Sequence, residues 1–321
     1  MLAAKFDPSS DLPDLSGKVA IVTGGNAGIG FKTVRHLARK GAKVYLAARN
    51  EARATAAIAE LEAEGFGEGK GQVVWLKLDL ADPRLAKSAA EDFMSHESRL
   101  DILVNNAARL FSPYEKSHDG IQDTMMVNHV SPFVFTQTLF PVLKRTAEAP
   151  GSDVRVVNVA SRGHAFAPSN IRFRNIDDFN QDFNRTWFPS LIRYGMSKLA
   201  NILWSKELQK RYDVEGLPII VVAIHPGDVN TDTATGFWGK FYLSWFVRLP
   251  IVTVSPEQGS YTSLFTAASP VVRARSEEFK GAYITPVGKI TKPSASAQSD
   301  ELAAELWETT ENLLKDLGIE I

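Results

Sequence analysis

The sequence of 321 residues contains no cysteine and only six histidines. The first absence excludes disulfide bonds, thiolate catalysis and cysteine-based metal sites, and it fits a reducing compartment such as the cytoplasm. No two histidines are spaced as ligands on one turn of a helix, so we expect no metal site. The net charge of −1, with acidic and basic residues interspersed, indicates no contact with nucleic acid. Small molecules are therefore the expected ligands.

A long uninterrupted apolar run is also missing. The most apolar window, 237–254, is interrupted by Lys240, Arg248 and Pro250, so no transmembrane segment is predicted. Residues 1–17 are polar and lack the apolar core, preceded by positive charge, of a signal peptide. We therefore expect a cytoplasmic protein.

Short apolar runs alternate with segments of helical period from residue 17 onward. The runs lie at 19–22, 43–48, 73–79, 101–105, 154–160 and 219–225. Such runs are typical of parallel strands that helices cover on both faces. No linker or repeat divides residues 1–321, and leucines at near-helical spacing predict a last helix over 300–317. The sequence thus predicts a single α/β domain, a doubly wound parallel sheet of Rossmann type.

Residues 23–30, Thr-Gly-Gly-Asn-Ala-Gly-Ile-Gly, follow the first apolar run and open a helix-like segment that ends near Lys40. Glycines at 24, 28 and 30 permit a tight turn and a close approach of the backbone to a ligand, and the next helix directs its free N–H groups into the same space. This order predicts a site for a dinucleotide pyrophosphate. A glycine turn without a catalytic meaning is the alternative, because such turns alone are weak signals.

Arg49 stands at the end of the second apolar run, where an NAD-selective protein would carry an acidic residue for the ribose diol. A guanidinium can pair with the 2′-phosphate of NADP, whereas a carboxylate would repel it. NADP(H) is therefore favoured over NAD(H). A solvated surface arginine is the alternative.

The glycine turn and the segment Tyr194-Gly195-Met196-Ser197-Lys198 together resemble the short-chain dehydrogenase/reductase family. Tyr194 and Lys198 lie four residues apart on one face of an expected helix, Ser161 ends the fifth run, and Asn128 lies on the fourth helix. The four match the family's Asn-Ser-Tyr-Lys set in order. The resemblance covers about residues 17–290, and through Ala-Arg-Asn and Lys-Leu-Ala-Asn it is greatest to the branch of retinol dehydrogenases and WW-domain oxidoreductases, including soluble fungal members.

The resemblance implies cofactor contacts at the carboxyl ends of the strands. Asp79 would meet the adenine amine, with capping of the helix at Pro83 as the alternative, and Ala108 replaces the glycine that usually follows Asn-Asn-Ala. Val229 and Thr231 would contact the carboxamide. The full set is Thr23, Gly24, Asn26, Gly28, Ile29, Gly30, Arg49, Asn50, Asp79, Leu80, Asn105, Ala107, Tyr194, Lys198, Pro226, Gly227, Val229 and Thr231.

Reduction of a carbonyl group requires a hydride from the cofactor and a proton for the oxygen. An unperturbed tyrosine has a pKa of about 10, and the charge of Lys198 would lower the pKa of Tyr194, the expected general acid/base. By the same resemblance Ser161 would hold the carbonyl oxygen, Lys198 would also bind the ribose, and Asn128 would support a water that relays protons to Lys198. Three histidines receive no catalytic role, because the mechanism needs no imidazole: His129, His164 and His225.

Two aromatic-rich segments are expected to cover the substrate, 162–193 and 233–254. The first begins and ends at predicted catalytic residues, and the second corresponds to the family's substrate lid. Simple packing is the alternative for both segments, and a membrane or dimer contact is a further alternative for the second. Aromatic walls favour a bulky, apolar ketone or alcohol as the substrate.

The residues together predict an NADP(H)-dependent oxidoreductase that interconverts a ketone or aldehyde and an alcohol on a bulky apolar or aromatic substrate. An NADP(H)-sensing regulatory protein on the same fold is the alternative. The presence of Tyr194 and Ser161 argues against it, because binding alone requires neither side chain. Relatives often pair through the helices that here would contain Asn128 and Tyr194, so a homodimer is left open.

Overall fold

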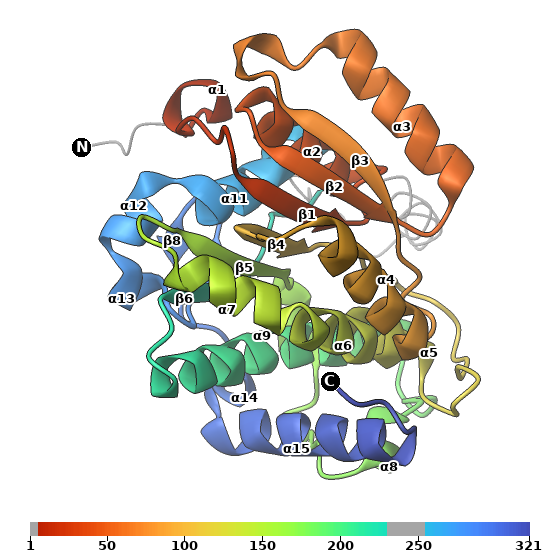
Figure 1. Ribbon diagram of the computed structural model, residues 1–321. Helices are drawn as coiled ribbons and strands as arrows, with labels where there is room; N and C mark the ends of the chain where they lie inside the picture. Colours follow the sequence, from red (N-terminus) through yellow and green to blue (C-terminus); the bar gives the residue numbers. More distant parts are fainter. Residues whose placement is uncertain (1–5, 230–253) are drawn as a thin grey trace.

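The computed structural model describes residues 6–229 and 254–321 (Figure 1). Within these residues eight strands form one sheet in the order β3-β2-β1-β4-β5-β6-β7-β8, and all neighbours are parallel except β7 and β8. The order reverses between β1 and β4, which confirms the doubly wound sheet. The strands are β1 Val19–Thr23, β2 Lys43–Ala48, β3 Gln72–Lys77, β4 Ile102–Asn105, β5 Val154–Val159, β6 Ile219–Ile224, β7 Tyr283–Thr285 and β8 Lys289–Ile290.

Helices cover both faces of this sheet (Figure 1). One face carries α2 Gly28–Arg39, α3 Glu51–Glu64, α11 Pro256–Ala268, α12 Pro270–Ala274 and α13 Ser276–Phe279. The other carries α4 Pro83–His96, α6 Ser131–Thr138, α7 Phe140–Glu148 and α9 Pro189–Val214, and α15 Asp300–Asp316 packs on α9. The shorter elements are α1 Pro8–Asp11, α5 Asp123–Met125, α8 Ile176–Phe179, α14 Ala295–Gln298, two 3₁₀ turns at Gly67–Gly69 and Arg162–Phe166, and a π-helical turn at Met126–Val130.

Alternate residues of the central strands face opposite apolar clusters. In β6, Ile219, Val221 and Ala223 pack towards α9, whereas Ile220, Val222 and Ile224 pack towards α11. A strand whose two faces are both covered must be apolar at every position, which explains the continuous runs in the sequence.

The six predicted strands are confirmed to within two residues at each end, and α15 confirms the predicted last helix. Strands β7 and β8 were not predicted, because segments of three and two residues carry no readable periodicity. β3 ends at Lys77, so Asp79 and Leu80 lie after the strand. None of the helices in the described ranges combines the length and apolarity needed to cross a bilayer.

The cap of α4 corrects one alternative from the sequence. The Oδ1 atom of Asp82 accepts a hydrogen bond from the backbone N–H of Arg84 at 2.8 Å, so Asp82 is the N-cap residue. Asp79 instead accepts from the N–H of Ala81 at 3.0 Å. The capping role considered for Asp79 is therefore wrong, because the residue adjacent to Pro83 fills it.

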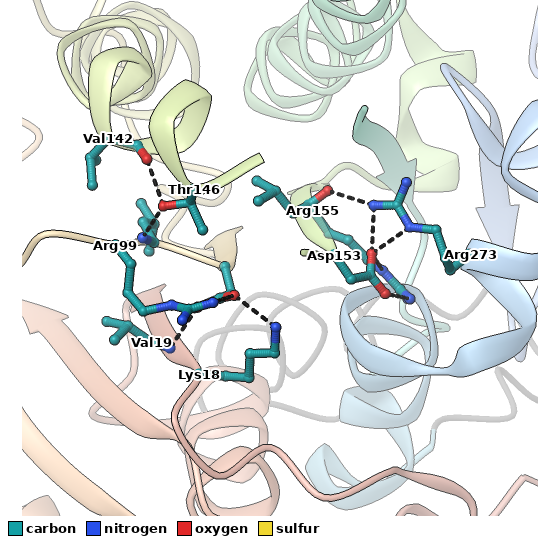
Figure 2. A network of polar contacts seen from close by, with 11 residues as sticks. Lys18, Val19, Arg99, Val142, Thr146, Asp153, Arg155 and Arg273 are labelled. Atoms are coloured by element: carbon teal, nitrogen blue, oxygen red, sulfur yellow. Dashed lines mark hydrogen bonds and ion pairs between the residues drawn. The ribbon is translucent and has the colours of Figure 1, made fainter. Parts of the chain in front are cut away.

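A buried carboxylate, that of Asp101, ties together the amino ends of β1 and β4, and three of its partners, Lys18, Val19 and Arg99, are labelled in Figure 2. The Oδ2 atom of Asp101 accepts from the backbone N–H of Val19 at 3.0 Å, and its Oδ1 atom accepts from Lys18 Nζ at 3.1 Å. Arg99 donates to both oxygens, at 2.8 and 2.6 Å. The residue is completely buried, so these bonds replace the hydration that the carboxylate loses.

A second network lies before β5 in the same figure (Figure 2). The buried guanidinium of Arg155 donates to Asp153 and, at 3.0 Å, to the carbonyl oxygen of Thr266 on α11. Arg273 on α12 donates to Asp153 Oδ1 at 2.9 and 2.6 Å. Together these bonds and those of Asp101 fix the amino ends of β1, β4 and β5. The candidate site lies at the opposite side of the sheet, at the carboxyl ends of the strands.

We expect Asp101→Ala to lower the free energy of unfolding by about 3 kcal/mol, because the change leaves a backbone N–H and two cations without their buried acceptor. The loss lies at the low end for a buried ion pair because Lys18 and Arg99 are partly exposed. Denaturant unfolding followed by circular dichroism measures it. Asp92→Ala, at a largely exposed carboxylate, should change stability by less than about 0.5 kcal/mol, and equal losses in both variants would contradict the assignment.

Candidate active site

The glycine turn between β1 and α2 is shaped for close approach of an anion. Gly24 and Gly28 have φ values of +65° and +55°, which favour glycine. A Cβ atom on Gly30 would lie 2.6 Å from Asn106 Nδ2 and closer still to the carbonyl oxygen of Gly24. Helix α2 begins here, and its N-cap residue, Ala27, supplies no side-chain hydrogen bond to the first turn. The N–H groups of this turn could therefore accept an anion, and the pyrophosphate site stays a prediction.

Thr23 and Asn106 hold the glycine turn in place. The Oγ1 atom of Thr23 accepts hydrogen bonds from the backbone N–H groups of Asn106 and Ala107, both at 2.9 Å. The Nδ2 atom of Asn106 donates to the carbonyl oxygen of Thr23 at 2.8 Å. The hydroxyl of Thr23 thus faces the loop after β4. Asn106 was missed as a site residue, although it stands in the Asn-Asn-Ala motif.

The segment after β6 meets the start of α2. A Cβ atom on Gly259 of α11 would lie 2.6 Å from Val229 Cγ2 and 3.2 Å from Ile29 Cγ1, so these side chains converge on one glycine. Gly227 turns the chain with a φ of +98° after Pro226. Val229 forms a parallel bridge with Val254. Thr231 and residues 233–253 lie outside the described residues, so the predictions for them stay predictions.

The remaining predicted cofactor residues lie at the carboxyl ends of β2, β3 and β4, apart from Asn26 in the turn after β1. Arg49 is exposed and makes no ion pair with any described residue, whereas Asn50 caps α3 by accepting from Arg53 N–H at 2.9 Å. The Nδ2 atom of Asn105 donates to Thr136 and Asn158, and so joins β4 to α6 and β5. Asn26 lies in the turn after β1, Asp79 and Leu80 follow β3, and their contacts with the cofactor stay predictions.

Three of the four predicted catalytic residues meet where β5 ends against α9. Lys198 Nζ lies 5.7 Å from the centre of the Tyr194 ring, and both residues are buried. Ser161 follows β5, and its side chain lies close enough to Tyr194 to lower the pKa of the phenol. A Cβ atom on Gly163 would lie 3.2 Å from both Ser161 Oγ and Tyr194 Cε1, so the chain passes tightly between these side chains.

The fourth predicted catalytic residue, Asn128, lies in the π-helical turn and joins α9 to the loop after β4. Its Oδ1 atom accepts from the backbone N–H of Arg109 at 2.7 Å. Its Nδ2 atom donates to the Arg109 carbonyl oxygen at 3.0 Å and to Ser197 Oγ at 2.9 Å. Ser197 in turn donates to the carbonyl oxygen of Tyr194 at 2.8 Å. Both side-chain polar atoms of Asn128 are therefore engaged in holding the site together.

Burial dominates the acid–base properties of this site. It raises the pKa of Tyr194 to about 12, against a lowering by the hydrogen bond with Ser161, and Asp228 adds to the increase. Burial also lowers the pKa of Lys198 to about 7. The chain's own groups therefore do not give the expected lowering of the Tyr194 pKa, because burial raises the pKa of the phenol and lowers that of Lys198.

The three histidines occupy packed positions, and the expectation that they are not catalytic stays a prediction. His129 is completely buried, its Nε2 atom lies 2.9 Å from Thr310 Oγ1, and burial lowers its pKa to about 3. His164 bonds through Nδ1 to the Ser161 carbonyl oxygen at 2.7 Å, and its Nε2 atom accepts from Ser294 N–H at 3.1 Å. Burial likewise lowers the pKa of His225, to about 4.

Of the six phenylalanine and tryptophan residues of 162–193, two are buried in the core, three are exposed, and Phe183 is partly buried against the core. Phe173 and Phe179 are completely buried in the core, and the Phe179 ring packs against His129, so the prediction of a substrate wall is wrong for them. α15 holds this part of the segment, because Thr309 Oγ1 donates to the carbonyl oxygen of Phe173 at 2.5 Å. Phe166, Trp187 and Phe188 are exposed and remain candidates.

Phe111 is an aromatic neighbour of the site that sequence reasoning missed. Its ring centre lies 5.1 Å from that of Tyr194, and its φ of +26° is unusual for a residue with a side chain. The signal was its place six residues after Asn105, in the loop at the carboxyl end of β4. Within the described residues, no cluster of His, Asp or Glu could hold a metal ion.

Known proteins resemble this chain over nearly its whole length. A family model described as short chain dehydrogenase matches residues 18–170. A short-chain dehydrogenase/reductase of Armillaria gallica is 44% identical over 317 residues, 98% of each chain. Retinol dehydrogenase 11 of Mus musculus is 34% identical over 301 residues, 94% of this chain and 87% of the relative. The WW domain-containing oxidoreductase of Pongo abelii is 35% identical over 303 residues, 94% and 69%.

A solved structure adds support from the fold. A short chain dehydrogenase of Burkholderia cenocepacia in complex with NADP has a TM-score of 0.62 and 26% sequence identity, and the match covers 86% of this chain and 98% of that one. The predicted resemblance to the retinol-dehydrogenase branch is also confirmed by the relatives above. The chain therefore belongs to the short-chain dehydrogenase/reductase family, and it is an oxidoreductase of that family.

Proposed function

We propose that the protein interconverts a ketone or aldehyde and an alcohol with NADP(H), on a bulky apolar substrate. The observation that carries the proposal is the meeting of Tyr194, Ser161 and Lys198 at the carboxyl end of β5. Ligands of open α/β sheets bind at that edge. The glycine turn lies at the same edge, after β1.

The chain offers a fitting group for each charged part of the cofactor. The first turn of α2 would hold the pyrophosphate, and Arg49 would pair with the 2′-phosphate. Lys198 has three N–H donors, of which two are engaged within the described chain, so the third can reach the ribose. The bound nicotinamide supplies or accepts the hydride. The NADP complex of the Burkholderia relative supports this assignment.

The side chains handle the proton. In reduction, the O–H bond of Tyr194 breaks and a new O–H bond forms on the former carbonyl oxygen, which Ser161 orients by a hydrogen bond. The phenolate left behind is stabilised by the ammonium form of Lys198 and recovers its proton from solvent. In oxidation, the phenolate accepts the proton of the alcohol.

Aromatic side chains around Tyr194 suit an apolar substrate. Phe111 packs against its ring, and Phe166 lies beside the next residue of α9, because a Cβ atom on Gly195 would lie 3.2 Å from Phe166 Cβ. Flat apolar walls favour aromatic or alicyclic ketones over small keto acids.

We expect Tyr194→Phe to reduce kcat about 100- to 10,000-fold, because the general acid is lost, while NADPH affinity stays within about threefold. NADPH consumption is measured on a panel of bulky aromatic and alicyclic ketones, and binding by NADPH fluorescence. Tyr212→Phe is the matched control, since Tyr212 is a buried tyrosine further along α9. Undiminished turnover in Tyr194→Phe, or tight NADPH binding by the wild type without reduction of any ketone, would contradict the proposal.

Arg49→Ala should weaken NADPH binding about 10- to 100-fold and leave NADH binding nearly unchanged, because the 2′-phosphate loses a charge-assisted pair. Dissociation constants for both cofactors measure the effect. Arg53→Ala removes another exposed arginine one turn into α3 and serves as the control. An equal loss for NADH and NADPH would exclude the proposed role of Arg49.

Alcohol oxidation should accelerate about tenfold per pH unit on the acid side of its profile, whereas reduction stays level there. The direction follows from the raised pKa of Tyr194: oxidation needs the scarce phenolate, and reduction needs the abundant phenol. Initial rates between pH 5 and 10, with the alcohol found in the ketone panel, give both profiles. A level oxidation profile would show that Tyr194 is not the base.

A further inference from the structure

Asn201 lies beside the predicted catalytic lysine, three residues further along α9. The residue is only 5% exposed. Its Nδ2 atom donates to the main-chain carbonyl oxygen of Asn128 at 2.7 Å, and its Oδ1 atom accepts from Lys198 Nζ at 3.2 Å. One side-chain amide therefore connects the backbone of the π-helical turn to the ammonium group.

The sequence explains why the Asn128 carbonyl is available. In a regular helix this oxygen would accept from the N–H group four residues later, but that residue is Pro132, which has no N–H. A buried carbonyl without a donor is costly, and Asn201 Nδ2 provides the donor. The proline and the asparagine thus complement one another across two helices.

Lys198 is held by neutral acceptors. Its Nζ atom donates to the carbonyl oxygen of Val159 at 2.7 Å and to Asn201 Oδ1. The titratable side chain that faces it is Tyr194 on its own helix. From β5 and the π-helical turn, the described residues present backbone carbonyls and amide groups, while the charge of Asp228 acts on Tyr194. Asn201 Oδ1 is therefore one of two acceptors among the described residues that favour the ammonium form of Lys198.

We propose that Asn201 is a positioning residue for the reaction: its amide fixes Lys198 against the Asn128 backbone and sustains the ammonium form of the lysine. This inference rests on the proposed function. The amide spans the distance between the Asn128 carbonyl oxygen and Lys198 Nζ directly.

The test is a measurement of the Lys198 pKa in the protein without substrate. Protein labelled with ¹³C at lysine Cε is titrated by NMR between pH 5 and 10, and the Lys198 resonance is identified by its absence in Lys198→Met. In Asn201→Leu, which keeps the number of side-chain heavy atoms but removes the acceptor, the Lys198 pKa should fall by about one unit below that of the wild type.

Gln209→Met is the matched control, because Gln209 is another buried amide on α9 and bonds to the backbone of β6. It should lower stability and leave the Lys198 pKa unchanged. If Asn201→Leu does not fold, Asn201→Asp carries the test, since a carboxylate at the Oδ1 position should raise the Lys198 pKa by one unit or more.

An unchanged Lys198 pKa in Asn201→Leu, or in Asn201→Asp where the first variant does not fold, would overturn the inference and reduce Asn201 to a packing residue. An equal fall in Gln209→Met would also overturn it. The titration needs no turnover. A protein that reduces no ketone, but in which Asn201→Leu lowers the Lys198 pKa, would contradict the proposed function and support the role of Asn201. A protein that reduces ketones, but in which the Lys198 pKa is unchanged, would support the proposed function and contradict the role of Asn201.

Discussion

The hydrogen bonds that join α9 to the π-helical turn are the interaction on which the site depends. Asn128 reaches Ser197 through its side chain and Asn201 through its backbone carbonyl, so two successive turns of α9 are fixed to one point. Tyr194 and Lys198 lie on these turns. Because a helix is stiff, fixing it there sets the distance of both side chains from Ser161 at the end of β5.

Stability and chemistry occupy opposite edges of one sheet. The ion-pair networks of Asp101 and Asp153 hold the edge where the strands begin (Figure 2), and they leave the other edge to glycines, asparagines and short polar side chains. At the carboxyl ends of β1 and β5, the groups that would contact cofactor and substrate are backbone N–H groups, a phenol and a buried lysine. The ion-pair networks stabilise the amino ends of the strands, and the buried polar groups of the site lie at the carboxyl ends.

Periodicity predicted the first six strands, because each is long enough to alternate between two covered faces. The order of motifs predicted the position of Tyr194, since helical spacing and strand ends are local properties. Contacts between distant segments could not be predicted in this way. Three contacts depend on three-dimensional packing and are not visible in the sequence. Thr309 of α15 bonds to the backbone of Phe173, Phe111 packs against Tyr194, and Asn201 bonds to the Asn128 backbone. Asn201 was visible only as part of Lys-Leu-Ala-Asn.

The most direct test of the central claim is the fate of the hydride. NADPH deuterated at C4 on the transferable face is incubated with the protein and the ketone panel, and the product alcohols are analysed by mass spectrometry. The account predicts an alcohol one mass unit heavier, with the deuterium on the former carbonyl carbon. When Tyr194 is replaced by phenylalanine, this labelled alcohol should no longer form. Bound NADPH that transfers no deuterium to any ketone would contradict it.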